Sequence, residues 1–461
     1  MGYFLRSTAR STAVEPICPS PSFNYTNLLR ESLAAAAEQR NDDPESEEEE
    51  TESDSASTPA GVRSRSSPLA TALGSHRLEE PEERVSKRKL KNKSNAKRAV
   101  KRRANANPGP SIETISQVLS HGVAIEADID ARAFDAAKGA HTGKPGTAKR
   151  LGSQSEVRAR YSVQELLRQG FRHILWDGRT PIPILDNSGL IISALAGQPG
   201  TDYSLDLEEV FKLFLEAGRD AGLEDTNPLG PHKRGSFPAF NRGVTMGMGS
   251  PTPVALKTGC MASILDRLVG HKAVRRMAAY QEAAFALWAP RMHAVYEATS
   301  NAMQDKLPHL PRNFPSTVFA AAAFNLGGKV WTFKHRDSLN WPFGWCAITA
   351  FGKFDPNQSA QLILWELKLV INFPHGATVL IPSAVITHSN TPVADGDVRM
   401  SFTQYTAGPI FRWVENGCQT EKELCRTDPA RYDEMQDGKE TAYLKRLQNF
   451  STVDELLEKI A

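Results

Sequence analysis

The stretch that decides the fold runs from residue 331 to residue 413 and holds three polar motifs. It opens with Thr332-Phe-Lys-His-Arg-Asp-Ser-Leu-Asn340, reaches Thr387-His-Ser-Asn390 after several short apolar runs, and continues to Val398-Arg-Met-Ser401. Turn residues such as Gly, Pro, Asn and Asp separate the apolar runs, as they separate β-strands. Eight or nine short strands between residues 316 and 414, among them 330–333, 384–388 and 411–414, predict a sandwich or jelly roll.

Two of these motifs contain residue types that bind transition metals. His335 and Asp337 are two positions apart, so their side chains share one face of a strand. His388 adds a second imidazole after the intervening strands. Two histidines and one carboxylate form the facial triad of non-haem Fe(II) oxygenases, which leaves coordination positions open. The motifs therefore predict a metal site, with purely structural histidines as the alternative.

The third motif supplies an anchor for a cosubstrate. Arg399 follows His388 by eleven positions, and Ser401 lies two residues further on the same strand face. A guanidinium group presents a fork of donors that matches a carboxylate. We therefore expect Arg399, assisted by Ser401, to bind the far carboxylate of 2-oxoglutarate. His375 competes with His388 as third metal ligand, but no arginine follows it at a suitable spacing.

These motifs resemble a family of oxygenases that modify DNA. Residues 332–350 and two stretches within 402–417 are similar to the TET/JBP-like oxygenases that are abundant in basidiomycete fungi. The resemblance extends roughly from residue 157 to the C-terminus and is densest over 319–417. The animal TET enzymes share the pattern H-R-D-x-x-N, which four residues match here: His335, Arg336, Asp337 and Asn340.

The resemblance implies a fold and a reaction. The implied fold is a double-stranded β-helix, here within an α+β chain whose helices buttress the sheets. The implied cofactor is Fe(II), with 2-oxoglutarate and dioxygen as cosubstrates. The implied reaction is oxidation of a methyl group on a DNA base, usually 5-methylcytosine, to the hydroxymethyl and further oxidised forms.

Substrate contacts are expected near the metal ligands and in one loop. A methyl group within a duplex is poorly placed for such a metal, so we expect the nucleotide to flip into the pocket. By its match to the TET pattern Asn340 would bind the base edge, and its alternative role is to cap a turn. Trp341 would shape the pocket or stack on the base, with core packing as the alternative. In the Gly-rich stretch 235–253, Arg242 would contact phosphate, although a plain connecting loop fits the composition.

The N-terminal part of the chain has the composition of a disordered tail. The protein has 461 residues and a formal net charge of +2, but residues 1–110 segregate an acidic block at 45–54 from a basic block at 87–103. The block from Lys87 to Arg103 predicts nuclear import through an import receptor, or contact with DNA phosphates. We therefore expect a nuclear protein. No apolar run is long enough to span a membrane, and no cysteine pair has zinc-site spacing.

The rest of the chain divides by pattern into four parts. Residues 111–160 are expected to be a linker, 161–310 the mixed N-terminal part of the catalytic domain, 311–417 the β-helix core, and 418–461 a helical tail. Within the second part the pattern predicts one long helical stretch that Pro290 should split.

Two other functions also fit the sequence. The same chemistry could act on N6-methyladenine in DNA, on methylated RNA or on a protein side chain. A member without turnover would instead bind nucleic acid only. The oligomeric state and the extent of oxidation do not follow from the sequence.

Overall fold

The structure is a computed structural model that describes residues 15–16, 111–136, 151–200, 202–223, 232–247 and 249–458. The predictions for the acidic block and for Lys87–Arg103 lie outside the described residues. Every structural statement below concerns the described part of the chain.

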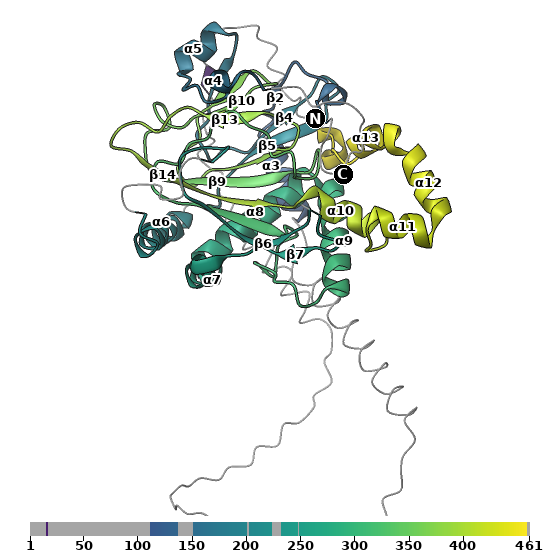
Figure 1. The fold of residues 1–461 in the computed structure, drawn as a ribbon. Coiled ribbons are helices and arrows are strands. Elements are labelled where there is room, and N and C mark those ends of the chain that lie inside the picture. The colour runs from purple at the N-terminus through teal and green to yellow at the C-terminus, as the bar shows by residue number, and fades with distance from the viewer. Residues whose placement is uncertain are drawn as a thin grey trace, which may run out of the picture. The chain divides into compact units, whose positions relative to one another are not determined.

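Within the described residues the core consists of two β-sheets, one of nine strands and one of five (Figure 1). The larger sheet contains, in spatial order, β2 (Ile125–Glu126), β4 (Ile182–Leu185), β5 (Ile191–Gly197), β12 (Thr378–Ile381), β9 (Cys346–Lys353), β14 (Val398–Tyr405), β8 (Ala321–Asn325), β6 (Ala239–Thr245) and β7 (Val254–Ala255). The smaller sheet contains β1 (Glu15–Pro16), β3 (Arg172–Leu175), β11 (Leu369–Ile371), β10 (Leu362–Leu364) and β13 (His388–Asn390).

The chain from β8 to β14 follows the path of a double-stranded β-helix. After β9 it crosses to β10 and β11 in the smaller sheet, returns at β12, crosses again to β13, and ends in β14 between β9 and β8. The predicted α+β fold with a jelly-roll core is therefore confirmed. Strands β3 to β6, which precede residue 311, extend both sheets, so the sheets are not confined to 311–417.

The side chains of strand β14 alternate between a buried apolar cluster on one face of the sheet and the space between the two sheets on the other. Met400 and Phe402 are fully buried in a cluster with Phe214 of helix α6 (Tyr203–Asp220) and with Phe324 and Phe351 of the neighbouring strands. Successive strand residues point to opposite faces. Arg399 and Ser401 therefore face the space between the two sheets, which is where the predicted cosubstrate anchor is needed.

Helices cover the larger sheet on the face that Met400 and Phe402 occupy (Figure 1). These are α6 (Tyr203–Asp220), α7 (Ala262–Gly270) and α8 (Lys272–Trp288), and α9 (Pro290–Lys306) follows α8 and packs against it. The predicted split at Pro290 is confirmed, because proline occupies the first turn of α9, where its missing N–H is not needed. Glu282 ties the two helices together by accepting from His293 at 2.6 Å.

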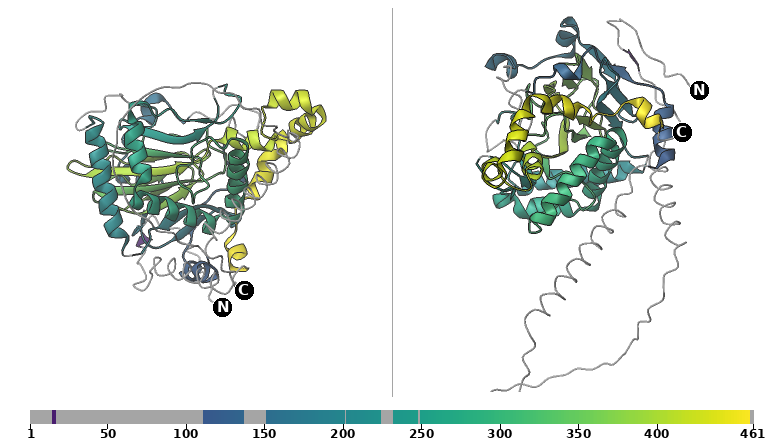
Figure 2. Two further views of the ribbon diagram at one scale, coloured as in Figure 1. Left: turned by 90° about the horizontal axis from the view of Figure 1, so that it is seen from below. Right: turned by 90° about the vertical axis from the view of Figure 1, so that its right-hand side faces the viewer.

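Apart from η2, the remaining helices precede β3 or follow β14 in the chain. The segment 111–136, expected to be a linker, contains α3 (Ile112–Ser120) and the 3-10 turn η1 (Ala131–Ala133), and it buries Val118 and Phe134. Helix α14 lies beside α3 (Figure 2). The other helices are α4 (Gln154–Val157), α5 (Val163–Arg168), η2 (Gly259–Met261), α10 (Gly408–Glu415), α11 (Glu421–Thr427), α12 (Pro429–Asp437), α13 (Lys439–Leu447) and α14 (Val453–Glu458). No described helix is long and apolar enough to cross a membrane.

Several predicted element types are wrong. The apolar run 411–414 belongs to helix α10 and not to a strand, because such a short run has no decisive period and Pro409 begins a helix. The stretch 235–253, expected to be a loop, contributes β6, which pairs with β8. The predicted strand 330–333 is extended chain without a ladder, and of 384–388 only His388 belongs to a strand. For the stretch 235–253, the pairing partner β8, which is distant in sequence, decided the outcome.

Candidate metal centre and cosubstrate anchor

The structure brings His335, Asp337 and His388 together. Each offers one ligand atom, and these atoms lie within 4.8 Å of one another. The Nε2 atom of His335 is 4.0 Å from one Asp337 carboxylate oxygen, and the Nε2 atom of His388 is 3.9 Å from the other. This is the cluster that the spacing predicted, assembled from segments more than fifty residues apart.

Backbone hydrogen bonds hold the ligand-bearing segments side by side. The N–H of His335 donates to the carbonyl of His388 at 3.1 Å, and the N–H of His388 donates back at 2.9 Å. This pair is an isolated antiparallel bridge at the end of β13. The N–H of Asp337 donates to the carbonyl of Ser383 at 2.9 Å. The two imidazoles are thus neighbours because their backbones pair directly.

The tautomer of each histidine follows from its second ring nitrogen. The Nδ1 atom of His335 is 2.7 Å from the carbonyl oxygen of Phe333, and that of His388 is 3.0 Å from the carbonyl oxygen of Ile386. A carbonyl only accepts hydrogen bonds, so both Nδ1 atoms carry the proton. The Nε2 atom of each ring is therefore the nitrogen left for a metal. The carbonyl that accepts from Nδ1 is the kind of partner that metal-binding histidines usually have.

The electrostatics favour the protonation states that a metal requires. Burial, followed by the neighbouring His388, lowers the pKa of His335 to about 3, so its imidazole is neutral. Burial raises the pKa of the Asp337 carboxyl, but the charge of Arg234 and a hydrogen bond from Ser383 act against it, and the pKa is lowered overall. Arg234 lies 3.6 Å from Asp337. Neutral imidazoles and an ionised carboxylate fit Fe(II) as a donor set.

Arg399 is buried with an incomplete set of partners. Its side chain is 2% exposed, and Nη1 donates to the carbonyl of Val330 at 2.6 Å. Its buried Nε has no hydrogen-bond partner among the described residues. Burial lowers the pKa of the guanidinium to about 10. Its Cζ atom lies 5.5 Å from the centroid of the Phe373 ring. A buried cation with an unused donor fits a carboxylate ligand, as the distal end of 2-oxoglutarate would supply.

Ser401 lies beside Arg399 with its hydroxyl oxygen already engaged as an acceptor. The side-chain amide of Asn325 donates to it at 2.9 Å. A hydroxyl that accepts one hydrogen bond still has its own hydrogen to donate. Asn325 is a site residue that the sequence analysis missed, because only the pairing of β14 with β8 places it opposite Ser401.

The alternative ligand His375 is used elsewhere. Its Nδ1 accepts from the N–H of Gly352 at 3.0 Å, on the strand next to β14. That glycine has a φ of 142°, and a Cβ there would lie 2.1 Å from the carbonyl oxygen of Val398. The close approach brings the two strands together beside Arg399. His388, and not His375, joins His335 and Asp337.

Asn340 lies in the turn that carries Asp337. Its N–H donates to the Asp337 carbonyl at 2.8 Å, and its side-chain amide donates to the hydroxyl of Ser383 at 3.0 Å. The side chain is buried. These contacts match the role of a turn cap, and a contact with a base stays a prediction.

Trp341 does not have a free face for a base. It is 2% exposed and stacks on Phe411, with ring centroids 4.4 Å apart and an interplanar angle of 11°. Tyr296 packs against it edge to face at 5.7 Å. The predicted stacking on a base is therefore wrong for Trp341. Phe343 and Trp345 are equally buried, because the apolar run after Asn340 enters the core.

Replacing Trp341 with alanine is expected to destabilise the fold by about 3–5 kcal/mol, the usual cost of deleting a buried large aromatic side chain. Chemical denaturation measures this change. Metal affinity per folded molecule should stay at the wild-type value. A stable Trp341→Ala protein with lost substrate binding would instead restore the base-stacking role.

Arg242 does not have a free guanidinium for phosphate. Its Nη2 is 2.8 Å from the carboxylate of Asp266, and its Nη1 donates to the side chain of Asn313 at 2.6 Å. The prediction of a phosphate contact is therefore not supported. The adjacent residue Asn241 lies on the opposite face of β6. Its side chain accepts a hydrogen bond from the hydroxyl of Tyr405 at 3.0 Å. Asn241 and Tyr405 were not found from the sequence, since no local pattern marks them.

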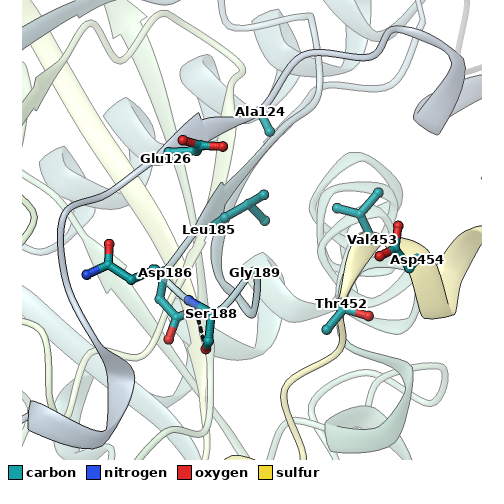
Figure 3. Close-up of a pocket in the computed structure, with 10 residues that line it drawn as sticks. Ala124, Glu126, Leu185, Asp186, Ser188, Gly189, Thr452, Val453 and Asp454 are labelled. Atoms are coloured by element: carbon teal, nitrogen blue, oxygen red, sulfur yellow. Dashed lines mark hydrogen bonds between the residues drawn. The ribbon is translucent and has the colours of Figure 1, made fainter. Parts of the chain in front are cut away.

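A separate cavity of about 400 Å³ lies between β4 and the C-terminal helix α14 (Figure 3). One of its acidic lining residues, Asp186, accepts from the N–H groups of Ser188 at 2.9 Å and of Ala131 at 3.1 Å. Asp186 thus closes the turn between β4 and β5 and fastens η1 to it. Its role there is structural.

Comparison with known proteins gives structural matches only. No protein-family model and no curated protein matches the chain. A structure of NgTET1 in complex with 5mC DNA matches with a TM-score of 0.37 and 12% identity, over 54% of this chain and 91% of that one. A 2OG-Fe(II) oxygenase family oxidoreductase from Burkholderia pseudomallei matches with a TM-score of 0.22 and 14% identity, over 44% of this chain and 87% of that one. Both TM-scores are low, so the fold and site stand on this chain's own topology and residues.

Proposed function

We propose that this protein is an Fe(II)- and 2-oxoglutarate-dependent dioxygenase that oxidises the methyl group of 5-methylcytosine in DNA. The observation that carries the proposal is the cluster of His335, Asp337 and His388, with both Nε2 atoms free, in one β-helix with the buried Arg399. A triad and a separate carboxylate anchor are the two parts that this chemistry requires of a protein.

The protein's share of the chemistry is position and protonation state. With Fe(II) held by His335, Asp337 and His388, the site would supply oxidation of a methyl group, with 2-oxoglutarate and dioxygen as cosubstrates. His335 and His388 offer their Nε2 atoms, and Asp337 offers a carboxylate whose charge Arg234 stabilises. Arg399 and Ser401 are both buried, so they would orient the cosubstrate away from bulk water.

The choice of substrate rests on the sequence motif. His335, Arg336, Asp337 and Asn340 match the H-R-D-x-x-N pattern of enzymes that act on 5-methylcytosine. N6-methyladenine is the second candidate, because the triad oxidises either methyl group by the same chemistry. We also propose a nuclear location, with import through Lys87–Arg103, because the substrate is chromosomal and this block has the composition of an import signal.

The test incubates purified full-length protein with Fe(II), 2-oxoglutarate, ascorbate and duplexes that carry either 5-methylcytosine or N6-methyladenine. Nucleosides from the digested duplexes are then measured by mass spectrometry, with His335→Ala as control. We expect hydroxymethylcytosine and further oxidised cytosines from the wild-type protein alone. The location is tested separately by imaging a tagged chain with and without the basic block.

Three outcomes would change the proposal. Loss of N6-methyladenine alone would move the assignment to demethylation of that base. Succinate formation without any altered base would retain the dioxygenase and reject these DNA substrates. Absence of succinate and of metal binding would overturn the enzyme and favour a nucleic-acid-binding protein.

A further inference from the structure

Arg336, which stands between two metal ligands in the sequence, binds a residue of the segment that the sequence analysis treated as a linker. Its Nη1 donates to the carbonyl of Asp135 at 2.9 Å, and its Nη2 donates to the Asp135 carboxylate at 3.0 Å. The side chains are only 10% and 17% exposed. This is a two-pronged, charge-assisted contact in a largely buried setting, where such contacts are strong.

Asp135 is itself held on a rigid support. The hydroxyl of Tyr443 in α13 lies 2.8–3.0 Å from the carbonyl oxygens of Ala131, Arg132 and Phe134. Phe134 is 1% exposed and packs against Phe343 of the core, with ring centroids 6.2 Å apart. The segment before Asp135 is therefore fastened at both its backbone and its side chains.

We infer that the Asp135–Arg336 pair is a positioning device for the metal centre, so that residues 111–136 belong to the catalytic framework. This inference rests on the proposed metal site. His335, Arg336 and Asp337 are consecutive, so the backbone torsions that aim the two ligands also set the place of Arg336. Holding Arg336 on a fixed partner restricts those torsions, and metal ligands need their geometry held within about half an ångström.

The closing experiment measures Co(II) binding by the full-length protein, because Co(II) reports its coordination geometry through visible absorption. Asp135→Asn keeps the size of the side chain and removes its charge. Asp130→Asn is the matched control, since Asp130 pairs with Arg132 at 2.7 Å in the same turn but on an exposed surface. We expect Asp135→Asn to weaken Co(II) binding about 10-fold, the lower end of the effect of losing an outer-shell partner, and to change the spectrum.

A second variant keeps the test decisive if Asp135→Asn folds poorly. Arg336→Lys retains the charge but loses the fork, so it should weaken Co(II) binding in the same direction. In the double variant the two losses should not add, because they remove one contact. In turnover, both variants should need more Fe(II) while the KM for 2-oxoglutarate stays unchanged.

The outcomes separate this inference from the proposed function. Folded Asp135→Asn and Arg336→Lys proteins with wild-type Co(II) affinity and spectrum would overturn the inference and leave the dioxygenase in place. An equal loss in Asp130→Asn would also overturn it, because the effect would then belong to the whole turn. A wild-type protein that binds no Co(II) would overturn the proposed function itself.

Discussion

Asp337→Ala is expected to abolish turnover and to weaken metal binding by more than the roughly 10- to 100-fold that an outer-shell partner contributes. The carboxylate is the only anionic member of the cluster, and it lies about equally far from both imidazoles, at 4.0 and 3.9 Å. Without it, Arg234 keeps its positive charge near the two histidines, and that charge repels a divalent cation. Isothermal titration with Co(II) measures the loss.

Asp337→Asn separates charge from shape at this position. It preserves the side-chain volume but not the anionic oxygen, so we expect it to lose metal almost as completely as alanine does. Asp395→Asn, on an exposed turn, serves as the control and should bind metal normally. Retention of tight, stoichiometric metal binding by Asp337→Ala would remove the triad from consideration.

Arg399→Met is expected to raise the KM for 2-oxoglutarate about 10- to 150-fold, which corresponds to the roughly 1.5–3 kcal/mol of a hydrogen bond to a charged group. Metal affinity should not change, since Arg399 contacts Val330, Phe354 and Phe373 and none of the ligands. Arg399→Lys should recover little, because a single ammonium group cannot reproduce the fork.

The stability of the Arg399→Met protein provides an independent readout. A buried guanidinium with an unpartnered Nε costs free energy without its ligand, so an apolar side chain of similar length should leave the free protein as stable or more stable. Addition of 2-oxoglutarate and Co(II) should then raise the Tm of the wild type more than that of the variant. Arg412→Met, at an exposed ion pair, is the control. An unchanged KM with a lower Tm would make Arg399 a structural residue only.

The sequence by itself determined the parts of this protein whose signals are local. Alternating and apolar runs with turn residues between them predicted the jelly-roll core, and Pro290 predicted the break between α8 and α9. The H-x-D spacing, the later His388 and Arg399 named a metal cluster that the structure brings together. These signals are readable because side-chain period, proline and ligand chemistry act at fixed, short spacings.

Only the tertiary structure decided which residues surround that cluster. Arg234 reaches Asp337, Asn325 reaches Ser401 and Asp135 reaches Arg336 through strand pairing and loop packing across dozens of residues. No local pattern encodes such contacts. The same long-range packing buries Trp341 in the core and pairs Arg242 with Asp266. A residue type fixes the chemistry that a side chain can perform, but the packing of distant segments fixes whether the side chain is free to perform it.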